Sequence, residues 1–170
     1  SQVTNPPIDS LRENEVMSLK TRFVNTGIIL DFENLTEENI YVLDSPVLSN
    51  SQFEKFSEFF KKDIKILDCT FNISESLKER LDDLRSEAES AVREGGKHLV
   101  LSDKDIGEKK APVPMTLAVG AVNSYLIQKS LRGFVSLNIQ TGDALDTHSY
   151  AILLGVGATT INPYLALDTI

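Results

Sequence analysis

Three side chains in this sequence have the chemistry of a nucleophile and its base. Cys69 is the sole cysteine, and His98 and His148 are the two histidines. A reactive cysteine needs a neighbouring base or a helix N-terminus to form its thiolate, and neither histidine is close to Cys69 in the sequence. Cys69 lies in an apolar stretch, where a thiol usually acts as a small core residue. We therefore interpret Cys69 as structural and predict no catalytic residue.

The sequence also contains no convincing metal-binding pattern. Two well-separated histidines and one cysteine do not make a zinc ligand set. Asp103 and Asp105 have the spacing of a hard-cation loop, but the acidic ligand expected at the end of such a loop is missing. We interpret residues 102–110 as a charged surface loop and predict no metal site.

Two glycine-containing segments are candidates for phosphate binding. Gly155 and Gly157 follow a helical pattern, so they do not form the strand-to-helix turn that cradles a phosphate. Gly142 is better placed, because it follows a predicted strand and precedes a predicted helix. Asp143 and Asp146 nearby would repel an anion. Two interpretations stay open here, namely a phosphate or flavin site and plain helix capping.

The elements that must position these residues alternate regularly from residue 63 to residue 170. Apolar, β-branched stretches predict strands over 64–71, 98–101, 134–139 and, more weakly, 159–161. Apolar residues at three- and four-residue steps predict helices over 74–94 and 114–131, a third ending at Gly155, and a last turn after Asn162. This alternation is typical of α/β folds with parallel βαβ units. Because a full barrel needs about eight units, we expect a rudimentary or partial TIM-barrel-like arrangement.

Residues 1–62 predict an irregular N-terminal arm that belongs to the same single segment, 1–170. Ser10 and Glu13 have capping-box spacing and predict a helix that ends before Gly27, followed by short strands over 27–32 and 41–43. Ser51 and Glu54 repeat that spacing and predict a second helix. One side of this helix carries four phenylalanines, which we interpret as core residues, with an aromatic ligand platform as the alternative: Phe53, Phe56, Phe59 and Phe60.

Composition narrows the class of protein. The chain has 170 residues, 41% of them hydrophobic, and a net charge of −8 without a basic block, which argues against nucleic-acid partners. The longest uncharged apolar stretch, 111–122, contains two prolines and is shorter than the ~20 residues of a membrane span. The lone cysteine fits a reducing compartment. We expect a soluble, cytoplasmic chain with no membrane partner. Because residue 1 is Ser, we also expect a processed protein or a segment of a larger one.

Several strings of the sequence occur in the order found in a known family. They are Gln2-Val3-Thr4-Asn5-Pro6-Pro7-Ile8-Asp9, Leu43-Asp44-Ser45-Pro46-Val47-Leu48-Ser49-Asn50, Gly120-Ala121-Val122 and Ile161-Asn162-Pro163-Tyr164-Leu165-Ala166. Together they resemble the central domain of the large subunit of glutamate synthase. The resemblance covers essentially the whole chain but only a small part of that enzyme, so we interpret the chain as a fragment of it.

The resemblance implies a role inside a larger enzyme. Glutamate synthase is an oxidoreductase acting on CH–NH2 donors that makes L-glutamate from L-glutamine and 2-oxoglutarate. It combines an amidotransferase domain with a synthase domain that carries FMN and an iron–sulfur cluster, and it takes electrons from ferredoxin or an electron-donor subunit. The central domain lies between the two, looks like a rudimentary relative of the flavin barrel and helps to form the internal ammonia channel. The resemblance therefore implies no cofactor in this fragment and no activity for the fragment alone.

The N-terminal loop is the expected contribution to that channel. Ammonia must travel uncharged, so its path should lack carboxylates. The loop offers neutral groups and rigid carbonyls without N–H donors, from Thr4, Asn5, Pro6, Pro7 and Ile8. The alternative is that this loop only caps the helix after it. Two other functions compete with the whole assignment: a stand-alone phosphate- or flavin-binding barrel-like module, and a small stand-alone interaction module.

Overall fold

The computed structural model describes residues 20–23 and 41–168. The chain divides into two compact units, Ser1–Pro46 and Val47–Ile170. In the first unit, strand β1 (Thr21–Phe23) pairs antiparallel with strand β2 (Tyr41–Leu43). The prediction for 41–43 is thus confirmed. The helix predicted from Ser10 cannot run on towards Gly27, because Thr21–Phe23 is extended by its pairing with β2. The predicted strand over 27–32 lies outside the described residues.

The second unit is built on a parallel four-stranded sheet, which confirms the α/β class. Its strands are β3 (Ile64–Asp68), β5 (His98–Ser102), β7 (Ser136–Gln140) and β8 (Thr160–Asn162). They lie side by side in chain order, β3-β5-β7-β8, and every neighbouring pair is parallel. Next to β8, Val47 forms a parallel bridge with Ile161. The described strands form an open sheet rather than a closed barrel.

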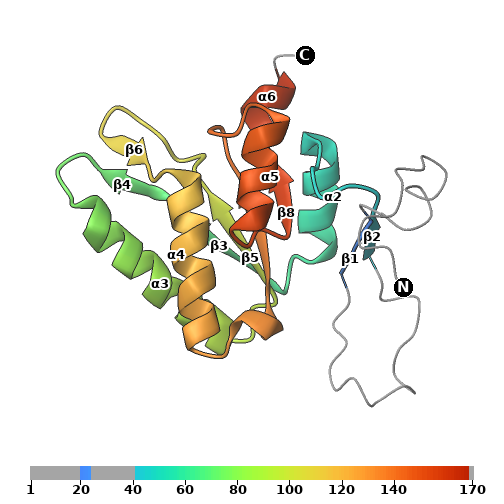
Figure 1. Cartoon of the computed structure of the whole chain (residues 1–170), viewed down its shortest axis with the longest axis horizontal. Coiled ribbons are helices and arrows are strands. Elements are labelled where there is room, and N and C mark those ends of the chain that lie inside the picture. Colours follow the sequence, from blue (N-terminus) through green and yellow to red (C-terminus); the bar gives the residue numbers. More distant parts are fainter. Residues whose placement is uncertain (1–19, 24–40, 169–170) are drawn as a thin grey trace, which may run out of the picture. The chain divides into compact units, whose positions relative to one another are not determined.

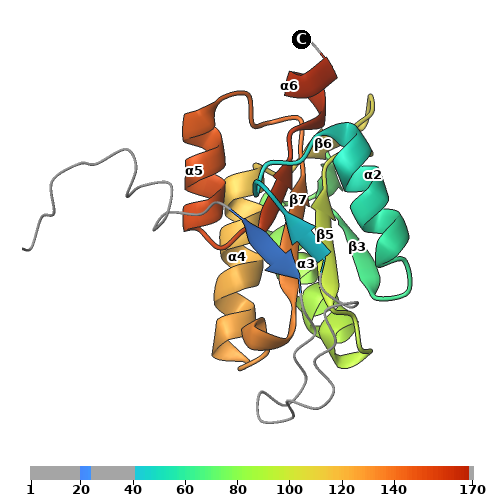
Figure 2. The ribbon, with the colours of Figure 1, turned by 90° about the vertical axis from the view of Figure 1, so that its right-hand side faces the viewer.

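Helices cover both faces of the sheet (Figures 1 and 2). Helices α3 (Leu77–Arg93), α4 (Met115–Gln128) and α5 (Thr147–Gly155) lie on one face, and α2 (Asn50–Phe59) lies on the other. The apolar core fills the space between the sheet and α3–α5. It includes Leu84, Leu99, Leu101, Val119, Leu137 and Ile139, all of which are fully buried. The 3₁₀ turn Arg132–Phe134 precedes β7, and the short helix α6 (Tyr164–Asp168) follows β8.

The predicted strand over 64–71 is wrong at its end, because the chain leaves the sheet after Asp68. The Asp68 carboxylate accepts hydrogen bonds from the Thr70 N–H (3.0 Å) and hydroxyl (2.8 Å), which is the local turn chemistry of aspartate. The chain continues as β4 (Thr70–Asn72), paired antiparallel with β6 (Lys110–Pro112). Part of the predicted surface loop 102–110 therefore leads into a second, two-stranded sheet.

Helix α2 begins two residues earlier than its predicted capping box. Ser49 is the N-cap, its hydroxyl accepts the Gln52 N–H at 3.2 Å, and the Gln52 side chain accepts the Ser49 N–H at 2.9 Å. The core interpretation is confirmed for Phe53 and Phe56, whereas Phe59 is 56% exposed. Across the described residues, none of the helices combines the length and apolar character needed to cross a membrane.

Candidate functional site

The carboxyl ends of β5 and β7 bring together a buried carboxylate and two polar neighbours. Asp103 directly follows β5, and Thr141 and Gly142 directly follow β7. Parallel strands end at the same edge of a sheet, and this edge is where open α/β sheets bind ligands. Asp103 is 1% exposed, which is unusual for a carboxylate and makes its surroundings a candidate site.

Neighbouring donors bind both oxygens of the Asp103 carboxylate. The Thr141 hydroxyl donates to Oδ2 at 2.5 Å, and the Gly142 N–H lies 3.1 Å from Oδ1 and 3.2 Å from Oδ2. Burial, followed by the hydrogen bond with Asp103 and its negative charge, raises the pKa of Tyr164 to about 12. A buried charge is stable only when donors of this kind replace its water.

This arrangement disfavours the phosphate or flavin site considered at Gly142. The Gly142 N–H already binds a carboxylate of the protein itself. A Cβ at this glycine would lie 2.6 Å from Leu165 Cδ1 and 3.0 Å from the Tyr164 hydroxyl, so there is little space above the loop. The N-terminus of α5 is capped by Asp146, which accepts the Ser149 N–H at 2.8 Å. The residues present therefore do not fit a flavin phosphate, and the loop has a structural function.

Gly155 and Gly157 end α5 instead of opening a helix, as the sequence indicated. Gly157 has a φ of +123°, a conformation that favours glycine. The Arg132 guanidinium fixes this corner, because it donates to the Gly157 carbonyl (2.9 Å), the Val135 carbonyl (2.6 Å) and Asn123 Oδ1 (2.7 Å).

The two aspartates considered as a cation loop point to different partners. Asp103 faces the Gly142 turn, whereas Asp105 forms an ion pair with Lys110. The Lys110 ammonium also lies 3.4 Å from the Asp68 carboxylate. Within residues 20–23 and 41–168, no three His, Cys, Asp or Glu side chains are grouped as metal ligands.

Cys69 and the two histidines are also not brought together. Cys69 is fully buried beside the end of β5, and burial raises the pKa of its thiol to about 12. His98 is at the other end of β5, where it pairs with Ile64. Its ring lies 4.2 Å from the Phe60 ring centroid, and burial lowers its pKa to about 4, so it is neutral. His148 is exposed at the start of α5.

The face of the sheet opposite α3–α5 carries a set of uncharged polar side chains that sequence reasoning missed. Across the strands, His98 Nδ1 and Ser136 Oγ are 2.8 Å apart, and the Asn138 amide donates to that same Ser136 oxygen at 2.8 Å. The Thr160 hydroxyl donates to Asn138 Oδ1 at 2.8 Å. Asn138 and Thr160 are both 0% exposed.

A second row of the same kind lies nearer the carboxyl ends of the strands. The Ser102 hydroxyl donates to Gln140 at 2.9 Å, and the Gln140 amide donates to Asn162 at 3.4 Å. The Asn162 amide in turn donates to Asn50 at the start of α2, at 2.9 Å. We call the side chains of both rows the neutral polar face: His98, Ser102, Ser136, Asn138, Gln140, Thr160 and Asn162. Their alternate positions along 98–102, 136–140 and 160–162 were the available sequence signal.

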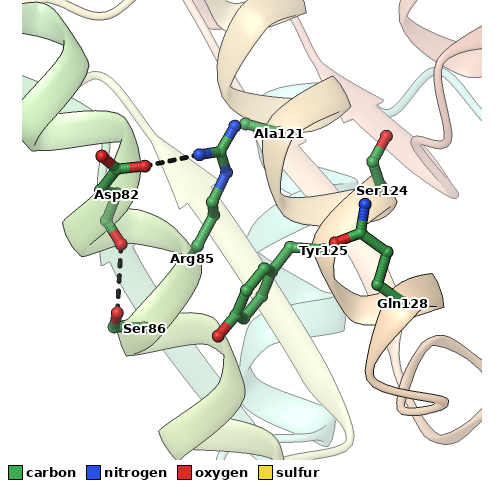
Figure 3. Close-up of a pocket in the computed structure, with 7 residues that line it drawn as sticks. All are labelled: Asp82, Arg85, Ser86, Ala121, Ser124, Tyr125 and Gln128. Carbon is green, nitrogen blue, oxygen red and sulfur yellow. Dashed lines mark hydrogen bonds and ion pairs between the residues drawn. The ribbon is translucent and has the colours of Figure 1, made fainter.

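A polar groove of about 430 Å³ also separates α3 from α4. Figure 3 shows Arg85 of α3 turned to Asp82, with which it is paired at 2.5 Å, and Tyr125 of α4 on the opposite wall. The Tyr125 hydroxyl donates to Glu89 of α3 at 2.8 Å. Arg85 and Asp82 both belong to α3, so of these two contacts the Tyr125–Glu89 hydrogen bond is the one that joins the helices. The channel residues expected from the sequence, Thr4, Asn5, Pro6, Pro7 and Ile8, lie outside the described residues.

Comparisons with known proteins point to one family. A family model described as the glutamate synthase central domain matches residues 1–170. The chain is 48% identical over its full length to the large chain of an NADPH glutamate synthase of Azospirillum brasilense, and 41% identical over 99% of its length to that of Bacillus subtilis. It is 40% identical over 99% of its length to a chloroplastic ferredoxin-dependent glutamate synthase of Spinacia oleracea. In each case it spans 11% of the relative's own length.

Proposed function

Because this chain belongs to the family of glutamate synthase central domains, we propose that it acts as a non-catalytic central domain inside a much longer glutamate synthase polypeptide. In that polypeptide it scaffolds an amidotransferase domain and an FMN-binding synthase domain. The parent makes L-glutamate from L-glutamine and 2-oxoglutarate. The names of the relatives include NADPH, NADH and ferredoxin, and we infer one of these as the source of electrons for the parent.

A scaffold must hold its own elements rigidly, and the polar contacts of this chain do so. Asp103 joins the ends of β5 and β7 to the Gly142 turn. Asn162 joins β8 to the start of α2 through the Leu48 carbonyl (3.1 Å) and Asn50 (2.9 Å). Throughout the described part of the chain, each buried side-chain nitrogen or oxygen has a hydrogen-bond partner. Such saturated networks favour a single arrangement of the elements.

We also propose that the sheet is a partial, TIM-barrel-like arrangement. The strands lie in chain order, β3-β5-β7-β8, and α3, α4 and α5 all lie on one face (Figure 1). Successive units of a β/α barrel have this order, with the helices outside and the strands inside. If the sheet is compared with a β/α barrel, the neutral polar face corresponds to the face that lines the inside of the barrel.

The chemistry of the neutral polar face favours the channel part of the proposal. Its side chains are amides, hydroxyls and one histidine whose lowered pKa keeps it neutral. A path for ammonia has to avoid carboxylates, because they stabilise ammonium. The seven side chains of the neutral polar face have this character. Asp68 of β3, the register partner of Ser102, adds a carboxylate to the same face, and α2 packs over it, so that Asn138 and Thr160 are 0% exposed. We propose that the loop carrying Thr4, Asn5, Pro6, Pro7 and Ile8 lines the passage or an adjoining domain interface.

Replacement of Asn5 tests the channel assignment in the full-length enzyme. Asn5→Leu should raise the ratio of glutamine hydrolysed to glutamate formed, with the excess released as free ammonia. Gln128→Leu is the matched control, because it makes a similar polar-to-apolar change on the exposed side of α4 and should leave the ratio at the wild-type value. An unchanged ratio in Asn5→Leu would contradict the assignment of this loop to the passage.

A further inference from the structure

Strand β3 is an edge strand whose outer side is open at one residue. The Asp63 carbonyl accepts the His98 N–H at 3.1 Å, and the Cys69 N–H donates to the Ser102 carbonyl at 2.7 Å. In a parallel pair, alternate residues direct both backbone groups to the same neighbour, so the odd-numbered residues of β3 face β5. The even-numbered residues, including Ile66, therefore direct their N–H and C=O groups away from the sheet.

The other two outward-facing residues, Ile64 and Asp68, each have one backbone group bound within the chain. The Ile64 N–H donates to the Phe60 carbonyl at 3.1 Å. The Arg80 guanidinium donates to the Asp68 carbonyl at 2.5 Å and to the Thr70 carbonyl at 3.1 Å. In the described part of the chain, the N–H and C=O of Ile66 have no partner, and its side chain is 71% exposed. An exposed strand edge of this kind is a template for pairing with another strand.

A negatively charged groove of about 750 Å³ runs along this edge. Ile66 lines it together with the carboxylates of Glu79, Asp83 and Glu87, which follow one another at four-residue steps on α3. Glu87 is paired with Arg80. Glu79 and Asp83 have no ion-pair partner in the described residues, and like charges at this spacing repel each other.

We propose that the outer edge of β3 receives an extended, Lys- or Arg-bearing segment from a neighbouring domain of the same polypeptide. The segment adds a strand beside β3. Its backbone pairs with Ile66, an apolar side chain covers the Ile66 side chain, and its cations neutralise Glu79 and Asp83. Strand addition takes its affinity from main-chain hydrogen bonds and its specificity from the flanking side chains. The inference rests on the proposed function, since it requires further domains in the chain, and the relatives have room for them because these residues span 11% of their length.

Hydrogen–deuterium exchange of the full-length polypeptide, resolved to single amides, tests the added strand. The amides of Lys65 and Leu67 are internal references, because they face β5. If a segment covers the edge, the Ile66 amide exchanges as slowly as these two. If Ile66 exchanges rapidly between two slow neighbours, the edge is open to solvent and the proposal is overturned.

Charge reversal tests the chemistry of the partner. The double variant Glu79→Lys/Asp83→Lys should speed exchange at Ile66 by about two- to tenfold, as expected from the loss of two partly exposed ion pairs. The control Glu54→Lys/Glu58→Lys makes the same charge change at four-residue spacing on exposed positions of α2, and should leave Ile66 unchanged. Equal responses of the two variants, or none in either, would exclude a basic partner. Exchange at Ile66 is independent of turnover, so this result and the ammonia ratio for Asn5→Leu can fail separately.

Discussion

The Asp103 carboxylate lies 3.1 Å from the backbone nitrogen of Gly142, although the two residues are 39 positions apart in the sequence. A loop of this position in an α/β sheet would ordinarily be free to bind an anion. Here the anion is a side chain of the same chain. At the edge of the sheet where such folds usually bind a ligand, this contact instead links the end of β5 to the end of β7. We call it the internal fastening.

Removal of this fastening should destabilise the fold. Asp103→Ala leaves the Thr141 hydroxyl and the Gly142 N–H without their acceptor, and each buried unpaired donor costs about 1–3 kcal/mol. We expect the free energy of unfolding, measured by urea denaturation, to fall by about 2–4 kcal/mol. Asp105→Ala removes an exposed aspartate and should change it by less than about 1 kcal/mol. Equal effects of the two variants would contradict the fastening role of Asp103.

Two neighbouring glycines should respond to alanine in opposite directions. Gly157 has a φ of +123°, and a Cβ there would lie 2.4 Å from the Asn123 side chain. Gly157→Ala should therefore lower the midpoint of thermal unfolding, with a cost of about 1–3 kcal/mol from backbone strain alone. Gly155 is the last residue of α5, and a Cβ there meets nothing within 4 Å. Gly155→Ala should raise the midpoint, since alanine in a helix is favoured over glycine by about 0.5–1 kcal/mol. If both variants lose stability, the positive φ of Gly157 does not distinguish the two positions.

Acid should destabilise the chain through His98. Burial lowers the pKa of His98 from 6.5 to about 4 in the folded state, so the unfolded state binds more protons between these values. Stability from this residue is then fully present above pH 6.5 and is lost as the pH falls towards 4, by up to roughly 3 kcal/mol. Urea denaturation at a series of pH values should show this slope in the wild type and in His148→Gln. In His98→Gln the slope over this range should be much shallower, and an unaltered slope would assign the proton uptake to another group.

The alternation of elements could be predicted from the sequence because it depends on local patterns. The apolar steps over 74–94 correspond to α3 (Leu77–Arg93), and the apolar stretch over 98–101 corresponds to β5, whose residues are all buried. The family could also be predicted from the sequence, since the resemblance rests on the order of short strings along the chain.

Elements whose ends depend on side chains were predicted less well. The strand over 64–71 breaks because the Asp68 side chain binds the backbone and hydroxyl of Thr70. Helix α2 starts earlier than predicted because Ser49 and Gln52 form the capping box. Ser51 and Glu54 have the same spacing but do not form it. Two sites in one segment can satisfy the same local rule, and packing selects between them.

The sequence by itself determined the α/β class, the core position of Cys69 and the family, because periodicity, composition and motif order are properties of neighbouring residues. Only the tertiary structure decided that Asp103 fills the Gly142 turn, that seven uncharged polar side chains share one face of the sheet, and that the edge of β3 stays open at Ile66. Each of these depends on residues from separate strands and helices. The register between strands sets their distances, and that register is fixed only when the whole core packs.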